Sequence, residues 1–257
     1  MRHSALYTIL FSGAVCVVCA VLVSSSAVSL KEDQLRNAAL DKQRNVLFAA
    51  GLADPAEKLD AEQVQRLFDN IRPVVIDLKS GEATDIDPTL FDQAKAARNA
   101  NTSQEAPPNR ASVQRLPNHA LVYEVLEEGV PSLAVVPIEG YGLWSTLYGF
   151  LAVENDANTV RGITYYQHLE TPGLGGEVDN PKWKAAWPGR KIYDESGVPA
   201  LRVIKGAADP ADQAPYEIDG LTGATITSNG VTAMIEFWLG DNGFRSYLTK
   251  LREGQSR

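Results

Sequence analysis

A long apolar segment lies near the N-terminus. No charged residue occurs from Ser4 to Leu30, and Leu6 to Val23 alone is about long enough to cross a hydrocarbon core of about 30 Å as a helix. This pattern predicts a transmembrane anchor over 1–30, followed by one soluble domain over 31–257. The alternative is a cleaved signal peptide with Arg2 as its positive region and a small-residue site at 25–27. The length of the run argues against cleavage, because the apolar core of a signal peptide spans roughly 7–15 residues.

Helical spacing of apolar residues recurs after the anchor. Lys31 to Leu52 is polar with apolar positions at helical spacing, and it predicts a helix leading away from the anchor. A second helix is predicted over 64–71, ended by Pro73. Near the C-terminus a break at 240–243 separates two further helical faces. The first is formed by Val231, Ile235 and Trp238, and the second by Phe244, Tyr247, Leu248 and Leu251.

Runs of β-branched and aromatic residues, bounded by Gly, Asn and Asp, predict strands between these helices. The predicted strands are 74–76, 120–126, 147–153, 160–166 and 201–204. Residues 99–111 are polar and contain two adjacent prolines, so an exposed loop is expected there. The predicted fold class is therefore α+β, with a mostly antiparallel sheet and flanking helices.

Composition and charge limit the classes of function that this chain can have. The 257 residues are 44% apolar, enough to bury a core, and the net charge of -8 argues against nucleic acid as a partner. The two cysteines, Cys16 and Cys19, both fall in the apolar run. The rest of the chain therefore has no disulfide or thiolate metal cluster, and redox chemistry there requires a cofactor.

A segment rich in hydroxyl groups, 219–228 (DGLTGATITS), precedes the predicted helix of Val231. A helix N-terminus offers unpaired N–H groups and the positive end of the helix dipole, and small residues let a phosphate approach the backbone. The hydroxyl of Thr225 is a candidate for covalent attachment. The same residue types are also common helix caps, so the pattern alone leaves both interpretations open.

This segment resembles the Asp-x-x-(Ser/Thr)-Gly-Ala-Thr motif of the FMN-binding domain family, whose final Thr is esterified by FMN. The resemblance implies a phosphoester between FMN and Thr225, formed by a flavin transferase that reads the motif. The other cofactor-binding positions implied in this segment are Asp219, Leu221, Thr222, Gly223 and Ala224.

A second stretch, 168–177 (HLETPGLGGE), resembles the loop that the same family places beside the flavin, although alone it reads as a glycine turn. The resemblance implies cofactor-binding positions at Glu170, Thr171, Leu174 and Gly175. Three further candidates rest on side-chain chemistry. Tyr141 and Trp144 are suited to packing on the flavin ring or in the core, and Lys205 to pairing with FMN or to lying on the surface.

Two wider segments, 40–47 (LDKQRNVL) and 180–189 (NPKWKAAWPG), are similar to the C subunits of Na+-translocating NADH:quinone reductases. The resemblance implies an electron-relay subunit of a Na+-translocating NADH:ubiquinone oxidoreductase. Its partners would be other membrane subunits and membrane lipid, with the soluble domain on the periplasmic side of the bacterial inner membrane. The alternatives are the flavin subunit of an Rnf-type ferredoxin:NAD oxidoreductase, or a membrane-anchored scaffold without cofactor, in which Thr225 only caps a helix.

Overall fold

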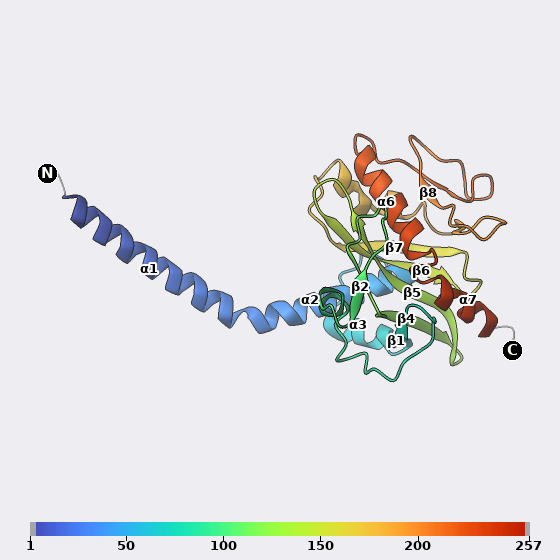
Figure 1. Cartoon of the computed structure of the whole chain (residues 1–257), viewed down its shortest axis with the longest axis horizontal. Coiled ribbons are helices and arrows are strands. Elements are labelled where there is room, and N and C mark those ends of the chain that lie inside the picture. Colours follow the sequence, from blue (N-terminus) through green and yellow to red (C-terminus); the bar gives the residue numbers. More distant parts are fainter. Residues whose placement is uncertain (1–3, 255–257) are drawn as a thin grey trace. The chain divides into compact units, whose positions relative to one another are not determined.

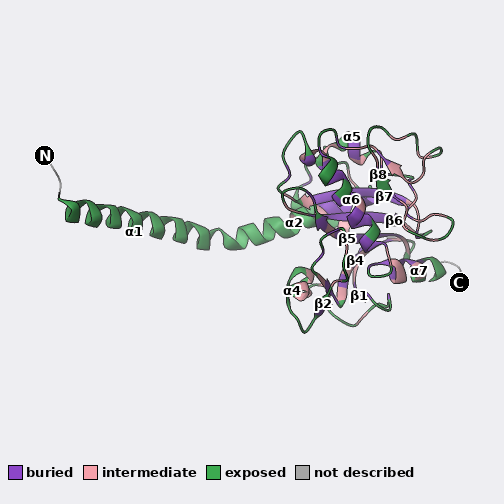
Figure 2. Ribbon diagram, turned by 45° about the horizontal axis from the view of Figure 1, so that its top comes forward, coloured by how far each residue is buried: buried purple, intermediate pink, exposed green. Residues whose placement is uncertain are grey.

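The computed structural model describes residues 4–254, so Arg2 of the signal-peptide alternative lies outside it. The chain divides into two compact units, Met1–Lys42 and Gln43–Arg257. In the first unit, α1 (Ala5–Ser29) has no buried residue and is drawn as exposed along its length in Figure 2. By length and composition α1 is suited to crossing a membrane.

The second unit is built on a five-stranded antiparallel sheet with the strand order β1-β4-β5-β6-β7 (Figure 1). The strands are β1 (Ile71–Asp77), β4 (His119–Glu127), β5 (Val130–Tyr141), β6 (Thr146–Glu154) and β7 (Val160–Gln167). Strands β4 to β7 follow one another both in the chain and in the sheet. The predicted α+β class with a mostly antiparallel sheet is confirmed.

Smaller elements and helices complete the chain. These are α2 (Lys31–Ala50), α3 (Ala61–Phe68), α4 (Gln93–Arg98), β2 (Ser103–Glu105), β3 (Arg115–Pro117), the 3-10 helix η1 (Gly175–Asp179), α5 (Pro181–Lys184), β8 (Arg202–Val203), β9 (Glu217–Ile218), α6 (Thr225–Trp238) and α7 (Arg245–Gly254).

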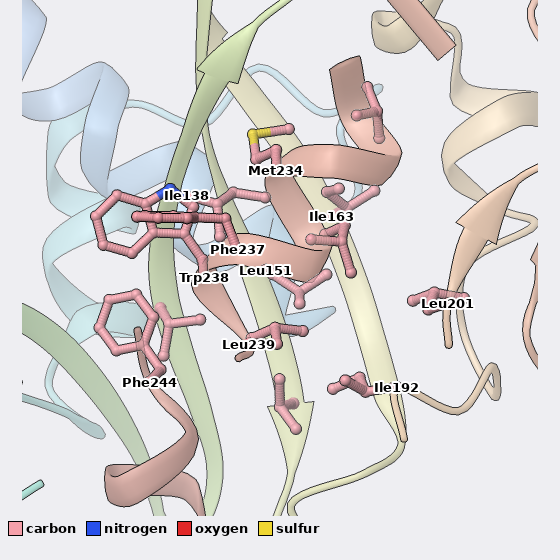
Figure 3. Packing of buried hydrophobic residues seen from close by; sticks show 14 of the residues in the cluster. Ile138, Leu151, Ile163, Ile192, Leu201, Met234, Phe237, Trp238, Leu239 and Phe244 are labelled. Atoms are coloured by element: carbon pink, nitrogen blue, oxygen red, sulfur yellow. The ribbon is translucent and has the colours of Figure 1, made fainter. Parts of the chain in front are cut away.

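Helix α6 packs on one face of the sheet, because successive strand residues point to opposite faces. Ile138, Leu151 and Ile163 lie on this face in three neighbouring strands, and Figure 3 shows them beside the helix. Met234 and Trp238 of α6 are fully buried in the same cluster. The core therefore fixes α6, and with it the position of the helix N-terminus.

The opposite face is covered by α3 and by the C-terminal part of α2 that belongs to the second unit. Phe68 packs edge-on against Tyr123, with ring centroids 5.9 Å apart. The Thr164 hydroxyl on β7 donates to the Asn45 carbonyl of α2 at 3.0 Å. The sheet is thus covered by helices on both faces.

Two predicted elements need correction. Helix α3 ends at Phe68, and Pro73 lies inside β1 rather than ending the helix. Strand β1 is at the edge of the sheet, where a proline without an N–H group costs no ladder hydrogen bond on the outer side. The strand expected over 201–204 is reduced to β8, which pairs in parallel with β9 outside the main sheet.

The exposed loop expected over 99–111 also needs correction. Strand β2 lies within it and pairs with β3, and Ser103 and Ala111 are buried. The reason is specific hydrogen bonding: Ser103 Oγ accepts from Arg115 Nε at 2.8 Å, and the Ala111 carbonyl accepts from the Tyr141 N–H at 2.8 Å. The first bond joins β2 to β3, and the second holds Ala111 against the end of β5.

Candidate functional site

Helix α6 begins at Thr225, and Ala224 occupies the N-cap without a side-chain hydrogen bond. In the part of the chain that the structure describes, the backbone N–H groups of Thr225, Ile226 and Thr227 have no hydrogen-bond acceptor. Gly223, with φ +73°, turns the chain into the helix in a conformation that favours glycine. Three free donors and the exposed Thr225 side chain therefore meet at the positive end of the helix dipole. The interpretation of Thr225 as the helix cap is wrong, because Ala224 holds that position.

Burial separates the hydroxyl groups of this segment into two kinds. Thr222 and Thr225 are exposed, whereas Thr227 and Ser228 are buried. The Ser228 hydroxyl accepts from the N–H of Leu221, which is itself buried, at 3.2 Å. The buried hydroxyls thus serve the local structure, and the exposed ones remain open to chemistry.

Asp219 supports a neighbouring loop. Its carboxylate accepts from the Ala208 N–H at 2.8 Å. At Gly220, an added Cβ would lie 2.3 Å from the Ile204 carbonyl oxygen, so the two chain segments are in direct contact. This contact places the loop of Lys205, whose side chain is exposed, beside the start of the 219–228 segment.

The glycine loop 168–177 lies against the N-terminus of α6. An added Cβ at Gly223 would approach Leu174 Cδ2 to 2.9 Å, so Leu174 touches the turn before Thr225 while 44% of its surface stays exposed. The Thr171 carbonyl accepts from the N–H groups of Leu174 and Gly176 at 3.1 and 2.9 Å, which closes the turn into η1. The structure therefore brings together the two segments that the sequence singles out.

Glu170, in the same glycine loop, is buried and only 5% exposed. Burial raises the pKa of its carboxyl, but hydrogen bonds from the Thr227 hydroxyl and from the backbone N–H groups of residues 143–145 outweigh burial and hold this pKa below its usual value. Glu170 is therefore ionised at neutral pH.

Tyr141 and Trp144 lie at the turn between β5 and β6, and both are exposed, Trp144 by 64%. The Tyr141 hydroxyl donates to the Trp144 carbonyl at 3.4 Å. Exposure excludes the core interpretation for both aromatics. Ile226, next to Thr225, is exposed as well, so apolar surface remains open on three segments around the helix N-terminus.

A pocket of about 400 Å³ extends along α6 from its first turn. Asn229 and Ala233 follow Thr225 at i+4 and i+8, so helical spacing predicts that they share its side of the helix. Arg110 and Ser112 come from a segment remote in sequence, and no local signal points to them. The pocket is lined by Arg110, Ser112, Tyr141, Gly142, Ile226, Asn229, Gly230, Thr232 and Ala233.

The chain matches known proteins along nearly its whole length. The FMN-binding domain family model matches residues 142–240. The C subunit of the Na(+)-translocating NADH-quinone reductase of Pseudomonas aeruginosa is 46% identical, with 99% of each chain covered. That of Yersinia pestis is also 46% identical, covering 96% of this chain and 93% of the relative.

Solved structures agree with these matches. The crystal structure of Shewanella oneidensis NqrC is 36% identical with a TM-score of 0.75, covering 82% of this chain and 96% of the other. The C subunit of the Na(+)-translocating NADH-quinone reductase from Parabacteroides distasonis is 25% identical with a TM-score of 0.66, covering 86% and 97%. The chain therefore belongs to the family of the C subunits of Na+-translocating NADH-quinone reductases, and residues 142–240 are its FMN-binding domain.

Proposed function

We propose that this chain carries one FMN, bound through a phosphoester to Thr225, and relays electrons within a Na+-translocating NADH:ubiquinone oxidoreductase. The observation that carries the proposal is the exposed Thr225 hydroxyl beside three unpaired N–H groups at the start of α6. Unpaired N–H groups and the positive dipole end stabilise an anionic phosphodiester at this position.

The surroundings also suit a flavin ring. The pocket of about 400 Å³ beside Ile226 has the size of a cofactor site. Exposed Tyr141, Trp144 and Leu174 provide flat and apolar surface next to the attachment point. An isoalloxazine ring tethered at Thr225 would cover apolar area that is otherwise in contact with water.

Attachment requires a partner enzyme, a flavin transferase. The Oγ–P bond forms at Thr225 as a phosphoanhydride P–O bond breaks in an activated FMN donor. The donor's other phosphate leaves with the electron pair of that bond and takes up the hydroxyl proton. Thr222 and Gly223 are exposed and suited to direct reading by the transferase, whereas Asp219 and Ala224 contribute by shaping the loop. Lys205 is placed to add positive charge near the segment.

Once bound, FMN supplies the redox chemistry, and the chain holds it in position for neighbouring cofactors on other membrane subunits. We place the second unit on the periplasmic side of the bacterial inner membrane, with α1 in contact with lipid. A covalent tether suits this location, because a cofactor held only by affinity is lost where its free concentration is low. The family assignment favours this complex over the Rnf-type alternative.

The experiment is co-expression of Thr225 variants with a flavin transferase. After denaturing electrophoresis, we expect flavin fluorescence on the wild-type chain and none on Thr225→Val, which keeps the side-chain shape but removes the nucleophilic oxygen. Thr225→Ser keeps a hydroxyl and is the matched control, expected to retain flavin. A folded Thr225→Val protein with wild-type fluorescence would overturn the assignment.

A further inference from the structure

Three segments that carry the proposed flavin contacts meet at the side chain of Glu170. Its Oε1 accepts from the backbone N–H groups of Leu143, Trp144 and Ser145 at 3.0, 2.9 and 3.3 Å. Its Oε2 accepts from the Thr227 hydroxyl, in the first turn of α6, at 2.6 Å. Glu170 therefore joins the Trp144 turn, its own loop and the start of α6 through one carboxylate.

The carboxylate of Glu170 is closely packed between two turns of the chain. An added Cβ at Gly142 would lie 2.7 Å from Oε1, and one at Gly175 would lie 2.4 Å from Oε2. Gly142 and Gly175 thus permit the carboxylate to sit between the two turns. The residue is only 5% exposed, and both carboxylate oxygens accept hydrogen bonds from within the chain.

The Trp144 turn depends on this carboxylate. In the described part of the chain, the N–H groups of Leu143, Trp144 and Ser145 have no acceptor other than Glu170. One further bond joins the same turn to the loop, from the Leu169 N–H to the Ser145 hydroxyl at 2.8 Å. Loss of the carboxylate would leave three backbone donors without a partner and release the turn.

We infer that Glu170 is a positioning residue: its carboxylate fixes Trp144 and Leu174 relative to Thr225, so that a flavin attached at Thr225 meets both side chains in one arrangement. The inference rests on the proposed function in one respect, the presence of a flavin at Thr225. The hydrogen bonds that carry the inference are all made between residues of this chain. Glu170 thus acts on the cofactor through other residues.

The test uses three variants. Glu170→Leu removes the carboxylate, Thr227→Val removes only its hydrogen bond to α6, and Glu170→Gln keeps an acceptor oxygen. Thr164→Val is the matched control, since Thr164 is another buried threonine whose hydroxyl makes one hydrogen bond, to Asn45 on the other face of the sheet. If the Thr227 hydroxyl only stabilised the fold, the two readouts described below would change equally in Thr227→Val and Thr164→Val.

The first readout is the fluorescence anisotropy of Trp144, measured in flavin-free protein. Trp144 is the exposed tryptophan, whereas Trp183, Trp187 and Trp238 are buried, so iodide quenches its emission selectively. The difference between emission with and without iodide gives its anisotropy, and Trp144→Phe confirms the assignment. We expect lower anisotropy in Glu170→Leu and Thr227→Val, a smaller change in Glu170→Gln, and wild-type values in Thr164→Val.

The second readout is the absorption spectrum of the attached flavin, which should shift in the same two variants and stay unchanged in Thr164→Val. Wild-type Trp144 anisotropy and an unshifted flavin spectrum in Thr227→Val would overturn the inference, even if Glu170→Leu fails to fold. Because anisotropy is measured without flavin, flavin retained on Thr225→Val would refute the proposed function while leaving the role of Glu170 in ordering Trp144 intact.

Discussion

At the scale of the residue, burial decides which of several similar side chains is free to react. Thr225 and Thr227 have the same hydroxyl and lie two positions apart in α6, about 200° apart around the helix axis. Thr225 is exposed, whereas Thr227 is fully buried and donates to Glu170. Burial therefore leaves the Thr225 hydroxyl accessible for the proposed attachment, whereas the Thr227 hydroxyl is engaged with Glu170.

Leu174 gives a prediction at this scale. Leu174→Asp should shift the absorption spectrum of the attached flavin, because Leu174 contacts Gly223, two residues before Thr225, and a charge there changes the surroundings of the ring. Leu169→Asp is the control, since Leu169 lies in the same loop and is 79% exposed. Attachment should persist in both. Equal spectra for wild type and Leu174→Asp would mean that the loop only forms a turn.

The lowered pKa of Glu170 predicts how stability changes with pH. A carboxyl with a lowered folded-state pKa stabilises the protein fully above its unfolded pKa, and this contribution is lost as pH falls through the folded pKa. The Tm of wild type should exceed that of Glu170→Gln at pH 7, and the difference should shrink in acid. The hydrogen-bonded pair of His168 and Asp179 nearby is present in both proteins. A difference in Tm that is independent of pH would contradict this account.

At the scale of the element, α6 owes its position to glycines at close contacts with β5. An added Cβ at Gly230 would lie 2.3 Å from the Tyr141 carbonyl oxygen, and one at Gly140 would lie 2.8 Å from Met234 Cβ. Side chains at these positions would push the helix away from the strand. The close approach thus brings Thr225 and Tyr141 to the same site.

Gly230→Ala tests this packing. Helix propensity alone predicts that Ala stabilises a helix interior by about 1 kcal/mol relative to Gly. We expect the opposite sign, a loss of about 1–3 kcal/mol of unfolding free energy, because the methyl group meets backbone rather than a flexible side chain. Gly254→Ala, at the end of α7 with nothing within 4 Å of the added atom, should leave stability nearly unchanged. Denaturant unfolding of both variants measures the difference, and a stabilised Gly230→Ala protein would contradict the contact.

Elements with clear periodicity could be predicted from the sequence. Strands β4, β6 and β7 and helix α6 follow from alternation or helical spacing, whereas β5 was missed because Pro131 and Pro137 interrupt it. Pairing between β4 and β5 extends only to Val135, so the missing N–H of Pro137 costs no hydrogen bond with β4. This register is set by the pairing of β4 with β5, and it cannot be predicted from the local sequence alone.

The candidate site likewise contains residues that could be predicted from continuous sequence segments and residues that only folding brings together. Both motif segments were predicted, because each is continuous in sequence and resembles a known family. Arg110 and Ser112 were not, since only folding brings them to the pocket. The burial of Glu170 also depends on contacts with two distant segments, so its hydrogen bonds with Trp144 and Thr227 could not be predicted from the sequence.

At the scale of the whole molecule, residues 1–42 and 43–257 form two separate compact units. Helix α1 buries no residue, whereas α2 buries Asn45, Leu47 and Ala50 among others in its C-terminal part. A chain that begins at Lys31 should therefore be soluble without detergent and keep the Tm of the full-length domain. A large loss of Tm on truncation would mean that α1 stabilises the fold. In the full-length protein, a mature N-terminus at Val28 would show that the anchor is cleaved.

Sidedness gives a second prediction at this scale. In cells with a permeabilised outer membrane, added protease should digest the second unit while cytoplasmic proteins remain intact, because we place this unit in the periplasm. Immunoblotting against the C-terminus measures the loss. Protection of the domain until the inner membrane is lysed would contradict that location.

The central claim is the phosphoester at Thr225, and peptide mass tests it most directly. Tryptic cleavage after Lys205 and Arg245 gives one peptide, 206–245, that contains Thr222, Thr225 and Thr227. In protein matured with its transferase, this peptide should carry the added mass of FMN less one water, and fragmentation should place that mass on Thr225. An unmodified peptide from the yellow protein, or a flavin located on another residue, would contradict the account.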